Sequence, residues 1–332
     1  MKVLIVGGTG EISTSLTWAL ARAGHDVTVF NRGRRQVALP EDVRTLQGDR
    51  DEPGALEAAA RDASYDAVLD FICWNGDQAR ADVAAFAGRC GHFVYISTVW
   101  VYGPPRCFPV AEDHPCNPSD TYAKNKREAE LVFAQAADGI RFPATTVRFH
   151  ATYNDHSDWP GILQGDGTAP FRLVRGKPLL IHDRGVLPTH FLHADDAAVA
   201  LHGLIRRPEQ SRRRTFNLVG ESLTWRAVHD RLAEVLAVDA SYASVPAEII
   251  IEAFPDRSWA LAGVHQFAMC FSNEAICSVV PEFSVSVLLT EGYRRRLRVA
   301  GCERPYALED PDPDLTRSLD ELIGRTEVRV GY

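Results

Sequence analysis

Short apolar runs alternate with segments of helical spacing along the first half of the chain. The apolar runs predict buried strands, and apolar positions that recur at helical spacing predict helices between them. Strands that alternate with helices indicate a parallel sheet covered on both faces. The predicted strands are residues 3–6, 27–30, 43–46, 67–72, 93–96 and 145–148, and the predicted helices are 13–23, 53–61, 78–87 and 122–137.

The regular alternation fades after about residue 150. Residues 154–168 are rich in Asp, Gly and Pro and indicate a long loop. Residues 190–205 predict a strand that continues into a helix, and residues 215–220 predict one more strand. We therefore expect an α/β protein with two domains. The first comprises residues 1–150, with about 189–220 returning to it, and the smaller one comprises 151–188 and 221–332.

The chain of 332 residues is acidic, with 36 Lys and Arg against 44 Asp and Glu and a net charge of −8. An acidic chain is a poor generic partner for phosphate backbones, so we expect no nucleic-acid partner. The apolar run at residues 3–6 is too short to cross a bilayer, and the N-terminus lacks the pattern of a signal peptide, so we expect no membrane association.

The seven cysteines are odd in number and include no C-x-x-C pair. This favours reduced thiols in a cytoplasmic protein over a disulfide framework or a zinc site. A bridge between Cys107 and Cys116 in an oxidising setting is the alternative. We expect no metal site, because no spacing places the following side chains around one ion: His182, His190, His193, Asp195 and Asp196.

A glycine-rich turn follows the first predicted strand and opens the first helix. Glycines permit a tight turn and a close approach of backbone to a pyrophosphate, and the free N–H groups at a helix start face phosphate charge. The turn predicts a dinucleotide site, and an ordinary strand-to-helix turn is the alternative. Ser13 stands where a third glycine is usual, and we expect the Glu11 carboxylate to point to solvent, away from bound phosphates. The predicted contacts are Gly7, Thr9, Gly10, Glu11 and Ile12.

The second strand ends in "FNRGRR", where a cofactor with a free ribose 2′-hydroxyl usually meets Asp or Glu. Asn31 and Arg32 stand there instead, with Arg34 and Arg35 behind them, and guanidinium groups can pair with a 2′-phosphate. This favours NADP over NAD, and a solvated loop is the alternative. Further predicted cofactor contacts are Asp49 at the adenine, where a simple turn aspartate is the alternative, Arg50 and Phe71.

Candidate chemistry lies in "YISTVWVYG" and "TYAKNKREAE". Tyr122 and Lys126 are four residues apart and share one face of the predicted helix. A free tyrosine has a pKa of about 10, and a lysine ammonium and an oxidised nicotinamide both favour its phenolate. Thr98 can hydrogen-bond the same substrate oxygen. These three residues are the predicted catalytic set, and a surface helix pair is the alternative.

The motifs "GGTGEIS", "YISTVWVYG", "YAKNK", "TTVRFHATY", "FLHADDAAVAL" and "TFNLVGESLTW" resemble those of the extended short-chain dehydrogenase/reductases, the NAD(P)-dependent epimerase/dehydratase family. "GGTG" with "FNRGR" is most similar to a bacterial branch of it. The resemblance implies a doubly wound Rossmann sheet with a smaller C-terminal substrate domain, and a homodimer. It also implies that Tyr122 is the acid/base, that Lys126 holds the nicotinamide ribose and that Thr98 binds the reacting oxygen.

Departures from the family pattern narrow the reaction. Val99 and Trp100 follow Thr98, where dehydratases carry Asp-Glu and decarboxylating members resemble one another in a Glu, so we expect neither 4,6-dehydration nor decarboxylation. Thr189 stands where many nucleotide-sugar enzymes have an arginine that grips the nucleotide. Its absence puts a nucleotide carrier in doubt, and candidate replacements are Arg172, Arg175 and Arg184.

We therefore expect an NAD(P)-dependent oxidoreductase or epimerase that transfers hydride at a sugar-like hydroxyl or ketone, free or on a nucleotide carrier. The alternatives are an NADPH-dependent ketoreductase of a biosynthetic pathway and a non-catalytic cofactor- or RNA-binding protein on the same scaffold. The candidate substrate contacts are Trp100, His150, Tyr153 and Arg172, with packing as the alternative role for His150 and Tyr153.

Overall fold

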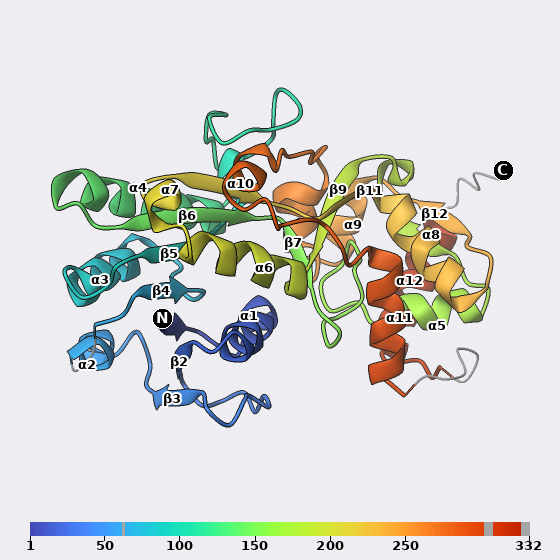
Figure 1. The fold of residues 1–332 in the computed structure, drawn as a ribbon. Helices are drawn as coiled ribbons and strands as arrows, with labels where there is room; N and C mark the ends of the chain where they lie inside the picture. The colour runs from blue at the N-terminus through green and yellow to red at the C-terminus, as the bar shows by residue number, and fades with distance from the viewer. Residues whose placement is uncertain (62–63, 302–307, 327–332) are drawn as a thin grey trace.

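A seven-stranded parallel sheet forms the centre of the larger part of the protein (Figure 1). The computed structural model describes residues 1–61, 64–301 and 308–326. The strand order is β3-β2-β1-β4-β5-β6-β10, and every neighbouring pair is parallel. The strands are β1 (Lys2–Val6), β2 (Asp26–Asn31), β3 (Arg44–Gln47), β4 (Ala67–Asp70), β5 (Phe93–Thr98), β6 (Ala144–Phe149) and β10 (Thr215–Leu218).

Helices cover both faces of this sheet, as the two-sided burial of its strands requires. Alternate side chains of β1 enter different cores: Val3 and Ile5 belong to the core on one face of the sheet, whereas Leu4 and Val6 belong to the core on the other. On the first face lie α1 (Glu11–Arg22), α6 (Ala194–Ile205) and α10 (Glu274–Val279), and on the second lie α2 (Ala55–Arg61), α3 (Gly76–Phe86) and α4 (Thr121–Gly139).

A smaller part, at the right of Figure 1, is built from the second half of the chain around its own core. Its three-stranded sheet has the order β11-β9-β7, and a two-stranded sheet pairs β12 with β8. The strands are β7 (Ala151–Tyr153), β8 (Leu179–Ile181), β9 (Pro188–His193), β11 (Glu221–Thr224) and β12 (Tyr242–Ser244). The helices are α5 (Ala169–Val174), α8 (Trp225–Leu236), α9 (Ala247–Ala253), α11 (Leu289–Val299) and α12 (Pro313–Thr326).

Short helical segments complete the described chain. A 3₁₀ turn at Val99–Tyr102 directly follows β5, and a second one lies at Asp183–Gly185. A π-helical turn spans Leu261–His265, and α7 (Pro208–Ser211) precedes β10. The first and third of these segments matter most, because both contribute residues to a cavity described below.

The predicted fold class is confirmed: the order 3-2-1-4-5-6 of the first six strands is the doubly wound Rossmann arrangement. Residues 154–168 contain no helix or strand, as their composition predicts. Part of the predicted returning segment behaves differently. β10 joins the large sheet and α6 packs on α1, but β9 pairs with β7 and β11 in the smaller sheet.

The described residues include six free cysteines, among them Cys107 and Cys116, and Cys302 lies outside the described ranges. Within the same ranges there is no cluster of side chains suited to a metal ion. No helix among them has the length and apolar character needed to cross a membrane.

Candidate functional site

The glycine turn between β1 and α1 needs its glycines for steric reasons. Gly7 has a φ of +86°, and a Cβ there would lie 2.7 Å from Cγ2 of Ile72. A Cβ on Gly8 would lie 2.4 Å from Cγ1 of Val29. Because β1 lies between β2 and β4, where the strand order reverses, this turn stands at the crevice in which doubly wound sheets bind ligands.

Ser13 closes the turn with its side chain. Its hydroxyl donates to the carbonyl oxygen of Gly7 at 2.6 Å and accepts from the N–H of Gly10 at 2.8 Å. A glycine at this position would make neither hydrogen bond. The small serine therefore replaces the usual third glycine and also holds the turn in shape.

The Glu11 carboxylate does not point to solvent, and that prediction is wrong. It accepts a hydrogen bond from the Thr152 hydroxyl at 2.7 Å and a second from the hydroxyl of Ser157. Asn154 donates from its side chain to the Glu11 carbonyl oxygen at 3.0 Å. The first residue of α1 is thus bound to β7 and to the loop after it, because the smaller part of the protein packs against the start of this helix.

A cavity of about 360 Å³ extends from this turn along the carboxyl ends of β4, β5 and β6. Its lining includes the glycines and helix N-terminus that suit a pyrophosphate, together with the buried Lys126. The lining residues are Gly7, Gly10, Glu11, Ile12, Ser13, Phe71, Ile72, Trp74, Ile96, Ser97, Thr98, Tyr122, Lys126, Phe149, His150 and Thr152.

Four predicted cofactor residues, Asn31, Arg32, Arg35 and Asp49, lie at or just after the ends of β2 and β3. The Arg32 guanidinium, with 53% of its side chain exposed, is 3.9 Å from the Asp49 carboxylate. Arg35 donates to the carbonyl oxygen of Thr9 at 3.5 Å, which brings it to the glycine turn. Asn31 accepts from the N–H of Gly33 at 2.8 Å, so its side-chain oxygen shapes the loop.

Arg50 lies elsewhere, and a side-chain contact with the cofactor is excluded by its burial. Its side chain is 3% exposed and donates to Asp70 at 2.6 Å and to Asp82 at 3.0 Å. Burial and the neighbouring Asp70 raise the pKa of Asp82 well above its usual value. Arg50 is therefore a structural residue that pairs with two buried carboxyl groups.

The Lys126 ammonium is held by backbone oxygens. It donates to the carbonyl oxygen of Ile96 at 2.6 Å and to that of Cys73 at 2.8 Å, and it lies 4.6 Å from the ring centre of Tyr95. Burial lowers its pKa to about 8. The side chain is thus pre-positioned at the lining of the cavity, with part of its donor capacity still available to a ligand.

Tyr122 stands four residues before Lys126 and lines the same cavity. Burial raises its pKa to about 12, against the opposing effect of a side-chain hydrogen bond with Thr98. Lys126 is not among the groups that shift the pKa of Tyr122. The expected lowering of the Tyr122 pKa by Lys126 is therefore not seen in the protein without its cofactor. The Tyr122 side chain is a protonated phenol near neutral pH.

A second cavity, of about 370 Å³, meets the first at Tyr122 and Thr98. Two tryptophans of its lining lie against the tyrosine: the centre of the Trp100 ring is 5.3 Å from that of Tyr122, and the centre of the Trp259 ring is 6.0 Å from it. The lining residues are Glu11, Thr98, Trp100, Tyr122, His150, Ala151, Thr152, Tyr153, Ser157, Asp158, Trp159, Pro160, Gly161, Ile162, Leu163, Gln164, Gly165, Phe191, Trp259, Ala260 and His265.

Three of the four predicted substrate residues line this second cavity, and the fourth does not. Trp100, His150 and Tyr153 are present, although the Tyr153 hydroxyl already donates to Val287 at 3.0 Å. Arg172 corrects the prediction: it is 1% exposed, donates to the carbonyl oxygen of Pro178 and pairs with a carboxylate of α12. It stabilises the smaller core instead of facing a substrate.

The sequence analysis missed Trp259 and His265, which line the second cavity. Both follow α9 in a region with no motif. The approach of Trp259 to Tyr122 depends on how the smaller part folds back, and no local pattern in the sequence indicates it. Trp159, in the loop predicted at residues 154–168, lines the cavity as well.

A buried ion pair fixes the end of β5 next to Thr98. Ser97 donates to the Glu130 carboxylate at 2.7 Å, and Arg148 makes a two-pronged contact with the same carboxylate at 2.9 and 2.7 Å. Although burial acts to raise it, the hydrogen bonds and charge of Arg148 hold the pKa of Glu130 below its usual value. The network joins α4, β5 and β6 directly behind the catalytic candidates.

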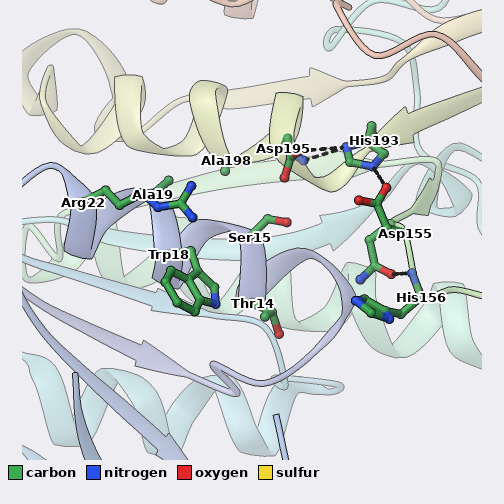
Figure 2. A pocket seen from close by; sticks show the side chains of 11 residues that line it. Thr14, Ser15, Trp18, Ala19, Arg22, Asp155, His156, His193, Asp195 and Ala198 are labelled. Atoms are coloured by element: carbon green, nitrogen blue, oxygen red, sulfur yellow. Dashed lines mark hydrogen bonds and ion pairs between the residues drawn. The ribbon is translucent and has the colours of Figure 1, made fainter. Parts of the chain in front are cut away.

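A further hollow, of about 550 Å³, lies between α1, α6 and the loop after β7. Figure 2 shows the side chains that line it. Trp18 and Arg22 form one side, and Asp155 accepts a 3.1 Å contact from the His193 ring on the other. None of the catalytic candidates lines it. Its contacts hold residues 154–156 against α1 and α6, while the next residues of the loop line the second cavity.

The sheet, the glycine turn and the two cavities define a dinucleotide-dependent α/β enzyme. Residues 3–219 match the model of the NAD dependent epimerase/dehydratase family. The chain belongs to this family, as the motifs in its sequence indicate, and the protein is an NAD(P)-dependent enzyme of the epimerase and reductase kind.

Relatives of this chain include both reductases and epimerases. The chain is 31% identical over 285 residues to 2′-dehydrokanamycin reductase of Streptomyces kanamyceticus, covering 85% of this chain and 80% of the relative. It is 27% identical over 169 residues to UDP-glucose 4-epimerase of Corynebacterium glutamicum, covering 45% and 50%. A crystal structure of UDP-glucose 4-epimerase from Thermotoga maritima superposes with a TM-score of 0.74 at 16% identity, covering 91% and 99%, and shares the fold.

Proposed function

We propose that this protein is an NADPH-dependent reductase that converts a ketone on a sugar-like ring into a secondary alcohol. The observation that carries the proposal is the position of Tyr122 and Thr98 on the boundary shared by the two cavities. The first cavity has the glycine turn and the lysine that a dinucleotide needs, and the second is lined by aromatic rings that suit the faces of a sugar.

The residues divide the work as follows. Lys126 holds the nicotinamide ribose, and Thr98 donates a hydrogen bond to the substrate carbonyl oxygen. When bound, the cofactor supplies the hydride that reaches the carbonyl carbon. Tyr122 gives its phenolic proton to the carbonyl oxygen and regains one from solvent, so that the products are the alcohol and the oxidised cofactor.

Two observations favour reduction over epimerisation. A pKa of about 12 keeps Tyr122 protonated near neutrality, which is the form that a proton donor to a ketone needs. A relative that is 31% identical and covers 85% of this chain is named as a reductase, whereas the match to the C. glutamicum epimerase is 27% identical and covers 45% of the chain.

The preference for NADPH rests on Arg32 and Arg35 at the end of β2, where no Asp or Glu in the "FNRGRR" segment opposes a 2′-phosphate. Neither 4,6-dehydration nor decarboxylation is proposed, because Val99 and Trp100 follow Thr98 and neither can transfer a proton. The homodimer and the cytoplasmic location expected from the sequence stay predictions.

The test is to supply NADPH and a panel of cyclic keto sugars to the purified full-length protein and to measure cofactor absorbance and product together. A reductase consumes one NADPH for each alcohol formed, and the Tyr122→Phe variant does not. An epimerase would instead convert an alcohol into its epimer without net consumption of cofactor. A protein with no Tyr122-dependent turnover on any ketone or alcohol would overturn the enzymatic proposal.

A further inference from the structure

Trp259 lies at the wall of the second cavity and keeps much of its ring accessible. It is 44% exposed, although tryptophans are highly buried on average in folded proteins. The centre of its ring is 4.8 Å from that of Trp100, which is 7% exposed. The Trp259 indole is therefore supported on one side by a buried ring and is open to a ligand over the remainder of its surface.

The backbone after Trp259 fixes this arrangement. The π-helical turn Leu261–His265 begins two residues later, and π-helical turns occur frequently at functional sites. A Cβ on Gly263 of this turn would lie 2.9 Å from Cζ3 of Trp100, so the turn packs directly on that indole. Leu261 is fully buried in the core of the smaller part. The Trp259 ring is thus held in place before any ligand binds, which lowers the entropic cost of binding.

The second cavity extends beyond the place of the reacting ring. In the proposed reaction the ketone reaches Tyr122 and Thr98, which lie where the two cavities meet. From there the lining continues to Gly165 in the loop after β7 and to Phe191 in β9. Its volume of about 370 Å³ is within the range of pockets that bury drug-sized ligands. A single six-membered ring at Tyr122 would leave part of this space to solvent.

The other tryptophan in this extension, Trp159, is engaged within the protein. The Arg296 guanidinium lies over its ring, 4.8 Å from the ring centre, and the Tyr293 ring is 5.7 Å away. Of the tryptophans that line the cavity, Trp259 is therefore the one with the largest accessible fraction. An accessible and rigidly held aromatic ring at a cavity wall suits the apolar face of a ligand ring.

We propose that the substrate is a glycoside of two linked six-membered rings, in which the ring with the ketone lies at Tyr122 and the other stacks with a C–H face on Trp259. The inference rests on the proposed function, since it concerns the substrate of the same cavity. The centres of the Trp259 and Tyr122 rings are 6.0 Å apart, so a group bound on the indole lies next to the phenol that donates the proton. Stacking of the second ring fixes the position of the ketone against Tyr122, which makes Trp259 a specificity-determining residue.

The test is a binding comparison on NADP⁺-saturated full-length protein, read by calorimetry. The probes are methyl β-D-glucopyranoside, which has one ring, and the methyl β-glycosides of cellobiose and maltose, which have two rings in different linkages. Because an aromatic contact adds both buried apolar area and a specific ring geometry, we expect at least one two-ring probe to bind about tenfold or more tightly than the one-ring probe. Equal binding of all three probes would overturn the inference.

Three variants locate the effect. Trp259→Ala should reduce the two-ring preference to about twofold or less, while the affinity for the one-ring probe changes by less than about twofold. Trp259→Phe keeps an aromatic face and should retain most of the preference. Trp18→Ala removes an indole that lines the hollow between α1 and α6 instead, so it is the matched control and should leave the preference intact.

The outcomes separate this inference from the proposed function. A two-ring preference that survives in Trp259→Ala, or that is lost equally in Trp18→Ala, would overturn the inference. Reduction of one-ring keto sugars that depends on Tyr122, without any two-ring preference, would leave the proposed function standing while the inference falls. A Trp259-dependent preference for two rings without any Tyr122-dependent reduction would instead contradict the proposed function.

Discussion

Lys126 of α4 donates a 2.6 Å hydrogen bond to the carbonyl oxygen of Ile96 in β5. The same strand ends in Thr98, and the same helix carries Tyr122. The lysine therefore joins the two elements that bear the catalytic candidates. Because the Lys126 ammonium is buried, its charge lowers the free energy of unfolding of the protein.

The first prediction concerns Lys126→Met. The folded-state pKa of Lys126, about 8, lies below its usual value of 10.5. Between these values the unfolded chain binds more protons than the folded one, so the stability of the wild type rises with pH in this window. Relative to the variant, the free energy of unfolding of the wild type should rise by about 2 kcal/mol from about pH 7 to about pH 9.5.

Chemical denaturation at both pH values measures this difference. Lys124→Met, at an exposed position of the same helix, is the control and should follow the wild type. If the curves of wild type and Lys126→Met stay parallel across the window, the ammonium is not destabilised by burial.

The second prediction concerns Tyr122→Phe. Loss of the phenolic proton donor should lower kcat by about 10²-fold or more, while the Kd for NADPH stays within a factor of about two. Tyr242→Phe is the control, because that hydroxyl bonds Asp230 in the smaller part of the protein. Steady-state kinetics measure kcat, and cofactor titration measures the Kd. Near-normal turnover of the Tyr122→Phe variant would show that Tyr122 is not the proton donor.

The third prediction concerns the choice of cofactor. Removing a guanidinium beside the 2′-phosphate by Arg32→Ala should raise KM for NADPH by about tenfold and leave KM for NADH nearly unchanged. Arg44→Ala removes an exposed arginine from β3 that pairs with Asp26, and it should change neither value. Equal effects on both cofactors would place the 2′-phosphate elsewhere or show that NADH is used.

The fourth prediction concerns the serine in the glycine turn. Ser13→Ala deletes the hydrogen bonds to Gly7 and Gly10 and should lower the free energy of unfolding by about 1–2 kcal/mol. Ser15→Ala, on the same helix, has no such bonds among those described and should be nearly neutral. Thermal and denaturant unfolding of both variants measure the difference. Equal stability of the Ser13→Ala and Ser15→Ala variants would mean that the Ser13 hydrogen bonds do not stabilise the turn.

The fifth prediction concerns the ion pair behind Thr98. Glu130→Gln leaves the buried Arg148 guanidinium without its counter-charge and should cost about 3–5 kcal/mol of stability. Glu128→Gln alters an exposed carboxylate on the same helix and should cost less than about 1 kcal/mol. Similar losses in the two variants would show that the buried pair does not stabilise this edge of the sheet.

The parts that sequence reasoning predicted correctly depend on local patterns. The parallel sheet covered on both faces follows from alternating strands and helices, and its Rossmann order is implied by the family motifs. The approach of Tyr122 and Lys126 to each other follows from their spacing on one helix. The glycine turn is local as well, since the positive φ of Gly7 is a property of the turn itself.

The parts that it could not predict depend on partners far away in the chain. Arg50, predicted to contact the cofactor, instead pairs with Asp82. Arg172, predicted to contact the substrate, instead pairs with Asp320 of the last described helix. Glu11 meets Ser157 from the other part of the protein. A charged side chain near a motif has no pattern that reveals which distant carboxylate or hydroxyl it will contact, so only the folded chain separates ligand-binding charges from structural ones.

The hydrogen bond between Glu11 and the loop after β7 joins the walls of the two cavities. Glu11 begins the helix that faces the cofactor, and Ser157, which it holds, belongs to the wall of the sugar cavity. A ligand in one cavity that moved Glu11 would change the binding affinity of a ligand in the other cavity. By thermodynamic linkage, the two affinities would change by the same factor. If the proposed cofactor and substrate both bind here, a cofactor that moves Glu11 would change the affinity for the substrate by the same factor by which the substrate changes the affinity for the cofactor.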